Sequence, residues 1–268
     1  MRTDGFEVGA LLFYGAAALS ALLDFESRQS SAGRRSFTLF SLGVLTHGTA
    51  LLHRAFEGSQ HVFGNVFVSF GFVAFLIGSF SLAFQWRFRE NSLALATLPL
   101  VLILTLLSQL GAYPLGAPGS GPLFLLHVVV TLIGYAALSF AFATAVMYLL
   151  QLRAIKDKKL GRVFAKFPSL AALDRAGYLA VLVGFPALTA GIGLGALYAG
   201  QVERSFWGDP KVMWAVLTWL IFGIYLFARG RNRWQGFRAA VLTIVGFLVL
   251  VFSYVVVSLF FSSFHSFA

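Results

Sequence analysis

The sequence of 268 residues contains no cysteine, which excludes disulfide bonds, thiolate metal ligands and a cofactor held by thioether bonds to the chain. Charged residues are also scarce, at 11%, whereas 59% of the residues are hydrophobic and 30 are phenylalanine. Soluble domains of this length carry far more charge, so this composition predicts a chain embedded in a lipid bilayer. We therefore expect an all-α, polytopic integral membrane protein that forms one transmembrane domain over residues 1–268.

A secretory signal is not expected at the N-terminus, because Asp4 and Glu7 outweigh Arg2 before the first apolar run. We expect that run to be retained as a helix. Membrane-spanning helices need about 20 apolar residues. Eight transmembrane helices are therefore predicted, over residues 7–23, 36–53, 66–84, 92–110, 121–152, 177–200, 212–229 and 237–261.

The lysines and arginines are distributed unevenly between the predicted loops. All 20 follow the first, third, fifth or seventh run, except Arg2, Arg54, Arg204 and Lys211. The positive-inside rule then makes both termini extracytoplasmic and makes residues 153–176 a basic cytoplasmic connector. The same bias explains the net charge of +10, so we expect no nucleic-acid partner.

Two local patterns concern helix ends and helix packing. Residues 167–174 of the connector fit either a short interfacial helix, with Pro168 near its first turn, or a solvated linker. In the sixth run, Ala187, Gly191 and Gly195 recur every four residues, which lets a neighbouring helix approach closely. Pro186 is expected to bend that helix.

None of the five histidines falls in a predicted cytoplasmic loop. His47 lies within the second run and His127 in the first turns of the fifth, and ionisable residues in a membrane span are costly enough to indicate function. Neutral imidazoles suit haem iron or a transition metal. A hydrogen-bonded, purely structural role is the alternative for both residues. His53 and His61, near an interface, are expected to be structural or solvated.

An extracytoplasmic, tryptophan-rich loop is predicted at residues 201–211. Phe206 and Trp207 lie in this loop, and Trp214 and Trp219 follow it, so these four residues are the expected walls of a binding site. Such an aromatic surface suits a flat, mostly apolar macrocycle such as haem. The alternative is an interfacial aromatic belt, which suits Trp219 in particular because it lies inside the seventh run.

Charged residues flank the same loop. Arg204 and Lys211 are candidate partners for the two propionates of a haem. Asp209 and Pro210 also fit the N-cap and first position of the seventh helix. The two interpretations are compatible.

The segment Trp207-Gly208-Asp209-Pro210-Lys211 resembles the tryptophan-rich core of the CcsA/HemX/CcmC superfamily of cytochrome c assembly and haem-handling membrane proteins. The similarity also includes Leu126-His127-Val128, the run from Trp234 to Ala240, and Phe264-His265-Ser266-Phe267, and it covers roughly residues 40–268. The resemblance implies that His127 and His265 are the axial ligands of a non-covalently bound haem b at the outer surface. His265, near the end of the sequence, is a candidate ligand mainly because of this resemblance.

One departure from the superfamily pattern bears on activity. His47 resembles the first of two intramembrane histidines of synthase-type members, but Phe227 stands where the second is expected, in Tyr225-Leu226-Phe227-Ala228-Arg229. We therefore do not expect a complete cytochrome c synthase. The resemblance is greatest to the HemX-like members.

The resemblance implies a haem-binding protein of cytochrome c biogenesis that presents haem at the extracytoplasmic face of a bacterial cytoplasmic membrane. Expected partners are haem, the bilayer, and an apocytochrome c or another assembly subunit. Alternatives are a regulatory or scaffold protein of haem biosynthesis, a haem transporter, and a structural subunit that has lost its ligand.

Overall fold

The computed structural model describes residues 5–26, 32–56, 66–88, 93–110, 121–158, 168–202, 206, 207, 209–231 and 234–256. Within these ranges the chain forms helices and no strand, which confirms the all-α prediction. The elements are α1 (Gly5–Glu26), α2 (Ala32–Phe56), α3 (Val66–Phe88), α4 (Leu93–Ser108), α5 (Pro122–Lys156), α6 (Leu170–Gln201), α7 (Pro210–Arg231) and α8 (Phe237–Val251), and the π-helix η2 (Phe252–Val256) continues α8.

Six of these helices are long and apolar enough to cross a membrane, namely α1, α3, α5, α6, α7 and α8 with its extension. Helix α4 is apolar but has only 16 residues. Helix α2 has 25 residues and is more polar, since it includes Arg34, Arg35 and Arg54. These helices make the chain a multi-pass membrane protein, and the count of eight spans stays a prediction.

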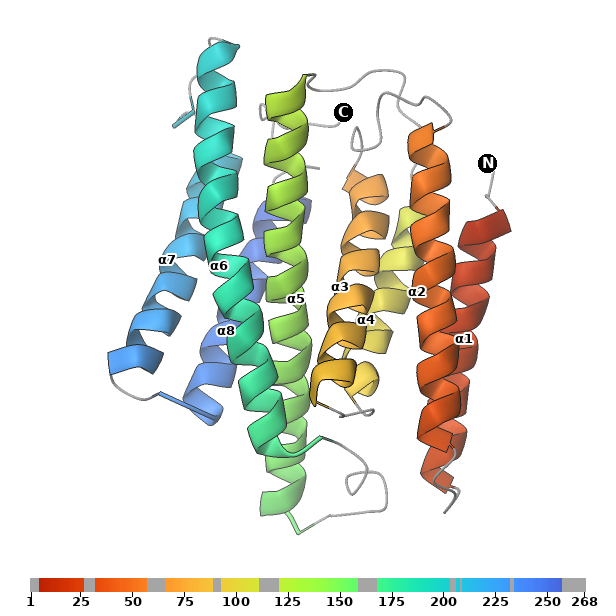
Figure 1. Ribbon diagram of the computed structural model, residues 1–268. Helices are drawn as coiled ribbons and strands as arrows, with labels where there is room; N and C mark the ends of the chain where they lie inside the picture. The colour runs from red at the N-terminus through yellow and green to blue at the C-terminus, as the bar shows by residue number, and fades with distance from the viewer. Residues whose placement is uncertain are drawn as a thin grey trace.

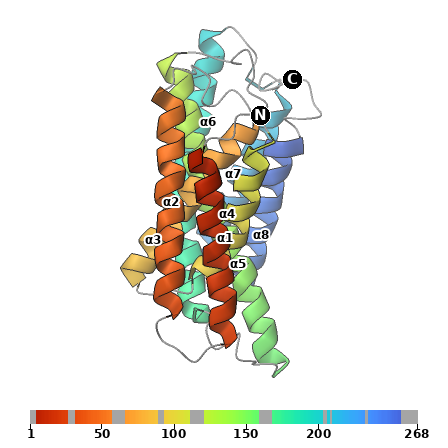
Figure 2. The same cartoon turned by 90° about the vertical axis from the view of Figure 1, so that its right-hand side faces the viewer.

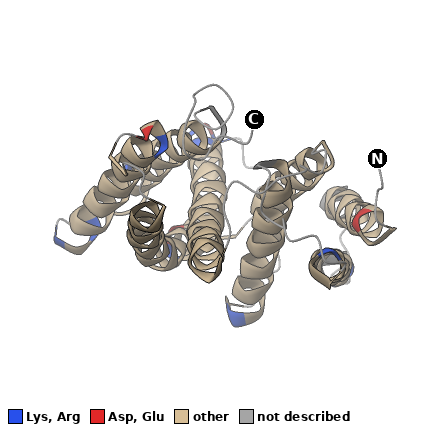
Figure 3. Ribbon diagram, turned by 90° about the horizontal axis from the view of Figure 1, so that it is seen from above, with Lys and Arg blue, Asp and Glu red and all other residues tan. Residues whose placement is uncertain are grey.

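Consecutive helices run in opposite directions (Figures 1 and 2). The first residues of α1, α3, α5 and α7 lie at one end of the bundle, which we call the outer end. The last residues of the same helices lie at the other end, which we call the basic end because it holds Arg87, Arg153 and Arg229. Seen from above, the ribbons are almost entirely tan, since charged residues are few (Figure 3). Which end faces the cytoplasm stays a prediction.

Helices α1 and α2 form a long pair at one side of the bundle, and α6, α7 and α8 lie at the other side (Figure 1). At the outer end a buried ion pair between Glu7 and Arg54 joins α1 to α2. Helix α5 lies in the middle and packs against α3, α4, α6 and α8. A continuous buried core links the two sides, from Phe40 and Ile77 to Phe140 and Phe222.

Helices α5 and α6 pack closely because glycines lie at their contact. A Cβ atom at Gly134 would lie 3.0 Å from the backbone nitrogen of Leu188, and one at Gly184 would lie 2.8 Å from the side chain of Leu138. Substitution at Gly191 would overlap Thr131. The small-residue pattern of the sixth run therefore marks a helix contact, as the sequence predicts.

The start of α6 differs from both sequence interpretations of residues 167–174. Leu170 to Asp174 are neither a separate interfacial helix nor a linker, because they form the first turns of α6, which continues through Pro186 to Gln201. The Ser169 side chain caps this helix by accepting a hydrogen bond from the Ala172 backbone nitrogen at 3.1 Å. Helix α6 therefore begins well before the predicted sixth span.

A polar cluster fastens α6, α7 and α8 together at the basic end. Both carboxylate oxygens of Asp174 accept hydrogen bonds from the Arg229 guanidinium, at 3.0 and 2.6 Å. Asp174 also accepts the backbone N–H of Gly236, the residue before α8, at 3.0 Å. The guanidinium stacks on Tyr178, 4.4 Å from the ring centre. The ends of three helices are thus fixed around one carboxylate.

Candidate functional site

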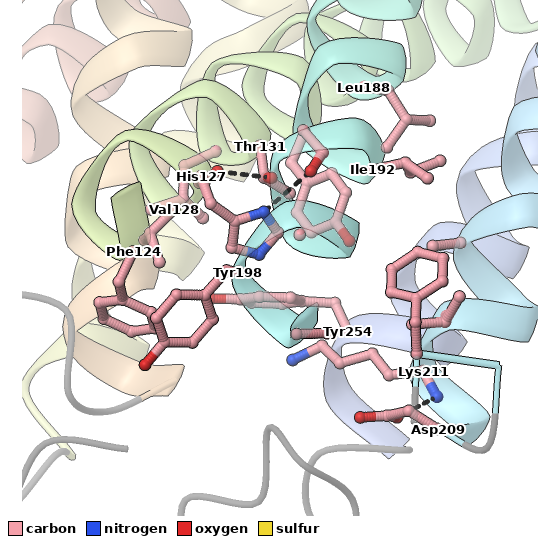
Figure 4. A pocket seen from close by; sticks show the side chains of 18 of the residues that line it. Phe124, His127, Val128, Thr131, Leu188, Ile192, Tyr198, Asp209, Lys211 and Tyr254 are labelled. Atoms are coloured by element: carbon pink, nitrogen blue, oxygen red, sulfur yellow. Dashed lines mark hydrogen bonds between the residues drawn. The ribbon is translucent and has the colours of Figure 1, made fainter. Parts of the chain in front are cut away.

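A pocket opens at the outer end between α5, α6 and α7, with η2 and the first turn of α3 completing its wall (Figure 4). It contains about 1100 Å³ of space, counted out to its open mouth. Its aromatic walls come from three elements and the loop before α7, through Phe124, Tyr135, Tyr198, Phe206 and Tyr254.

His127 extends into this pocket from the second turn of α5 (Figure 4). Its Nδ1 lies 2.8 Å from the carbonyl oxygen of Gly191 on α6. A carbonyl oxygen only accepts, so Nδ1 carries the proton and donates it, and the lone pair of the neutral ring is on Nε2. Metal-ligating histidines commonly donate their other ring N–H to a carbonyl or carboxylate oxygen in this way, which fixes both tautomer and ring orientation.

The His127 ring fits between the helices because Gly195 has no side chain. A Cβ atom at Gly195 would lie 2.8 Å from Cε1 of the ring and 3.1 Å from Nδ1. One turn further along α5, Thr131 donates a hydrogen bond to the His127 carbonyl at 2.7 Å. The ring is therefore held against one face of α6.

The start of α7 supplies the charged part of the pocket. Pro210 is the first residue of α7, and the Asp209 carboxylate accepts the Lys211 backbone N–H at 2.8 Å, which confirms the predicted N-cap and first-position proline. The Lys211 side chain is only 8% exposed and extends into the pocket (Figure 4). Its ammonium group lies 5.2 Å from the ring centre of Tyr254, a cation–π contact.

The three tryptophans of the predicted aromatic surface do not line this pocket. Trp214 packs on Phe252, with ring centres 4.4 Å apart, and so joins α7 to η2. The Trp219 indole donates a hydrogen bond to Thr189 of α6 at 2.8 Å. Trp207 is 73% exposed and contacts the pocket-lining Phe206 edge-on, 5.3 Å between centres. It lies at the rim.

His47 lies apart from the pocket, among α1, α2 and α3. It is 1% exposed, and the Tyr14 hydroxyl lies 3.4 Å from its Nδ1. Phe75 packs edge-on against the ring at 6.1 Å. The two intramembrane candidates, His47 and His127, therefore belong to different sides of the bundle. His53 is exposed at the end of α2, with its ring 5.8 Å from that of Phe6.

Several predicted residues lie outside the described ranges. These are the second axial candidate His265, the propionate candidate Arg204, His61, and part of the loop at 201–211. Among the residues that the structure does describe, no three metal-ligating side chains form a group.

Sequence reasoning missed the two buried tyrosines of the pocket. Tyr135 and Tyr254 contact each other edge-on, 5.3 Å between ring centres, and both line the pocket. A signal for Tyr135 exists, because His127, Thr131 and Tyr135 are spaced by four residues and share one face of a helix. Tyr254 comes late in an apolar run whose pattern carries no such mark.

Comparison with known proteins identifies the family of this chain. The profile of the family described as Cytochrome C assembly protein matches residues 36–265. The cytochrome c biogenesis protein CcsA of Synechococcus sp. (strain JA-3-3Ab) is 28% identical over 321 residues, covering 97% of this chain and 91% of that protein. CcsA of Mesostigma viride is 27% identical over 244 residues, covering 80% and 79% of the two chains.

A third relative matches more strongly over a shorter region. CcsA of Chlamydomonas reinhardtii is 37% identical over 144 residues, which cover 53% of this chain and 40% of that protein. The family match covers most of the described helices, the tryptophan-rich segment and the pocket. It confirms the resemblance to the superfamily that the sequence motifs indicate, and this chain belongs to the cytochrome c assembly protein family.

Proposed function

We propose that this chain binds haem b non-covalently in the outer-end pocket and presents it for cytochrome c assembly. The observation that carries the proposal is the His127 imidazole, which extends into an apolar pocket with Nδ1–H donated to Gly191 and its lone pair on Nε2. Imidazole nitrogen is a common axial ligand of haem iron. His265 is the proposed second axial ligand.

The other residues of the pocket fit the same ligand. Aromatic walls suit the faces of a porphyrin, and the buried ammonium of Lys211 suits a propionate. Trp207, exposed at the rim, is the proposed outer cover, and Arg204 is the proposed partner of the second propionate. Bound haem would supply an iron that takes two axial nitrogen ligands and vinyl groups that react with thiols.

The proposed role in cytochrome c biogenesis rests on the names of the relatives, all called CcsA. Thiols for haem attachment must come from another chain, because this one has no cysteine. An apocytochrome c or a further assembly subunit is therefore the proposed partner. Because relatives occur in Chlamydomonas as well as Synechococcus, the location in a bacterial cytoplasmic membrane remains a prediction. The closeness to HemX-like members also remains a prediction.

Binding and presentation are favoured over conduction of haem through the bilayer. Phe227, at the position expected for a second intramembrane histidine, is 63% exposed on α7, whereas His47 is buried among α1, α2 and α3. A bis-histidine site within the membrane would need both groups on one cavity. His47 is accordingly proposed as an auxiliary haem contact at most, and its hydrogen-bonded structural role is the simpler one.

The visible spectrum of the detergent-purified protein from haem-replete cells tests the proposal. We expect a Soret band in the wild type that is lost in His127→Ala and reduced in His265→Ala. His53→Ala is the matched control, because His53 is also at the outer end but exposed. His47→Ala is expected to keep the band.

Three other outcomes favour the alternative functions. Absence of a Soret band in the wild type would indicate a structural subunit. Partner regulation that survives loss of both axial candidates would indicate a scaffold. Haem uptake into vesicles that contain only this chain would indicate a transporter.

A further inference from the structure

A second pocket lies at the basic end of the bundle, whereas the pocket of His127 lies at the outer end. It is formed where α3 ends, α4 begins and α6 begins, and it is lined by Phe88, Leu93, Ala171, Ala172, Arg175 and Ala176. About 590 Å³ of space lies between these residues, counted out to the mouth. Among the described residues most of its wall is apolar, and the one charged side chain that lines it, Arg175, is basic.

Two arginines converge on the aromatic ring of this pocket. The guanidinium carbon of Arg175 lies 5.1 Å from the ring centre of Phe88, and that of Arg87 lies 5.6 Å from the same centre. Each guanidinium keeps its hydrogen-bond donors when it contacts a ring face. Two positive groups thus contact one aromatic ring at the pocket, Arg175 as a lining residue and Arg87 next to the lining residue Phe88.

Neither arginine is neutralised by a carboxylate among the described residues. Two other arginines of the same end are paired with a carboxylate, since Arg229 binds Asp174 and Arg153 lies 3.8 Å from Asp157. The pair Arg87 and Arg175 is therefore a local positive charge beside an apolar cavity. A ligand complementary to this pocket would carry an anionic group attached to an apolar body.

The level of the pocket along the bundle identifies the source of such a ligand. The candidate span of α3 ends at Phe88 and that of α6 begins at Leu170, so both arginines lie near the end of a candidate span. The ends of spanning helices are the parts that meet the headgroup layer. Trp86, beside them, is 80% exposed, as expected for an aromatic side chain in the interfacial layer. Basic pockets between transmembrane helices bind acidic lipid headgroups in this way.

We propose that the pocket at α3, α4 and α6 is a binding site for an acidic phospholipid of the adjoining leaflet. Its phosphate lies between Arg87 and Arg175, and the first segment of an acyl chain packs on Phe88 and Leu93. The lipid thereby joins the end of α3 to the start of α6, which no side-chain ion pair among the described residues does. This site is independent of haem.

Native mass spectrometry of the full chain, delipidated in detergent and then titrated with phosphatidylglycerol or phosphatidylcholine, tests the proposal. Basic side chains near an anionic lipid surface each contribute about a fivefold change in affinity. We expect phosphatidylglycerol to be preferred over phosphatidylcholine, and the double variant Arg87→Gln/Arg175→Gln to lower its affinity roughly 25-fold.

The matched control is Arg34→Gln/Arg35→Gln, which removes the same charge from exposed residues of the same end. It is expected to leave phosphatidylglycerol affinity within about twofold, because each guanidinium lies away from the pocket. Equal loss in both double variants would show diffuse attraction and overturn the site. So would equal binding of the two lipids, or binding of free glycerol phosphate as tight as that of the lipid. Far-UV circular dichroism checks that both variants keep their helices.

Discussion

The Nδ1 atom of His127 lies 2.8 Å from the carbonyl oxygen of Gly191, across the contact between α5 and α6. The proposed axial ligand is therefore oriented by the backbone of a neighbouring helix rather than by a carboxylate. A backbone partner adds no charge to an apolar pocket, and it moves only if the helix moves. The orientation of the ring therefore depends directly on how the two helices pack.

Gly195→Ala is predicted to weaken haem binding. The added Cβ would lie 2.8 Å from Cε1 of the His127 ring, so either the ring or α6 must shift and the bond to Gly191 is strained. Changes to the groups that orient a metal ligand typically cost about 10–100-fold in affinity. Haem titration followed at the Soret band measures the loss, and added imidazole should restore part of the spectrum by replacing the displaced ligand.

Gly193→Ala is the control for this prediction. It makes the same substitution two residues away in α6, where an added Cβ meets no atom within 4 Å. We expect wild-type haem affinity. If Gly195→Ala and Gly193→Ala both bind haem like the wild type, the orienting role of Gly195 is wrong even though haem binding stands. If no variant and no wild-type protein binds haem, the proposed function itself fails.

Asp209→Ala is predicted to loosen the start of α7. It removes the carboxylate that accepts the Lys211 backbone N–H, and loss of such an N-cap costs about 1 kcal/mol. Thermal unfolding in a single detergent should show the decrease, together with weaker haem retention because Lys211 starts from this turn. Asp209→Asn keeps a capping oxygen and is expected to retain most of the stability. A wild-type melting curve for Asp209→Ala would contradict the capping role.

The positions of the helices could be predicted largely from apolar runs, because a bilayer fixes how many apolar residues a span needs. The start of α6 could not. Asp174 and Arg175 make the segment look like a solvated connector, yet Asp174 is satisfied inside the bundle by Arg229 and Gly236. That pairing joins residues distant in sequence, and no local pattern reveals it.

Part of the candidate site could also be predicted from the sequence. His127 is conspicuous because an ionisable group in an apolar run is costly. The walls of its pocket were assigned to Phe206 and three tryptophans, and Phe206 does line the pocket. Trp214 and Trp219 instead pack between helices, while Tyr135 and Tyr254 line the pocket. Aromatic residues satisfy core packing and ligand contact equally well, so only the tertiary arrangement distinguishes the two uses.

Arg229→Ala is predicted to destabilise the bundle by roughly 3 kcal/mol, because it leaves the partly buried Asp174 carboxylate without its cation. Arg153→Ala removes the same kind of side chain from the same end, but Arg153 is 83% exposed and its contact with Asp157 is long, at 3.8 Å. We expect no measurable change for this control. Similar unfolding temperatures for the two variants would show that the Asp174 cluster contributes no more than a surface pair.

Phe227→His is predicted not to create a second haem site within the membrane. The residue is 63% exposed on α7, at the far side of the bundle from α2, and His47 is enclosed by Tyr14 and Phe75 (Figure 1). Two axial nitrogens must face one iron from opposite sides, which these helices do not allow without being rebuilt. The ratio of haem to protein in the purified variant should therefore equal that of the wild type. An additional haem that disappears in Phe227→His/His47→Ala would show that α2 and α7 approach each other in another conformation, and conduction of haem would then become the better account of the fold.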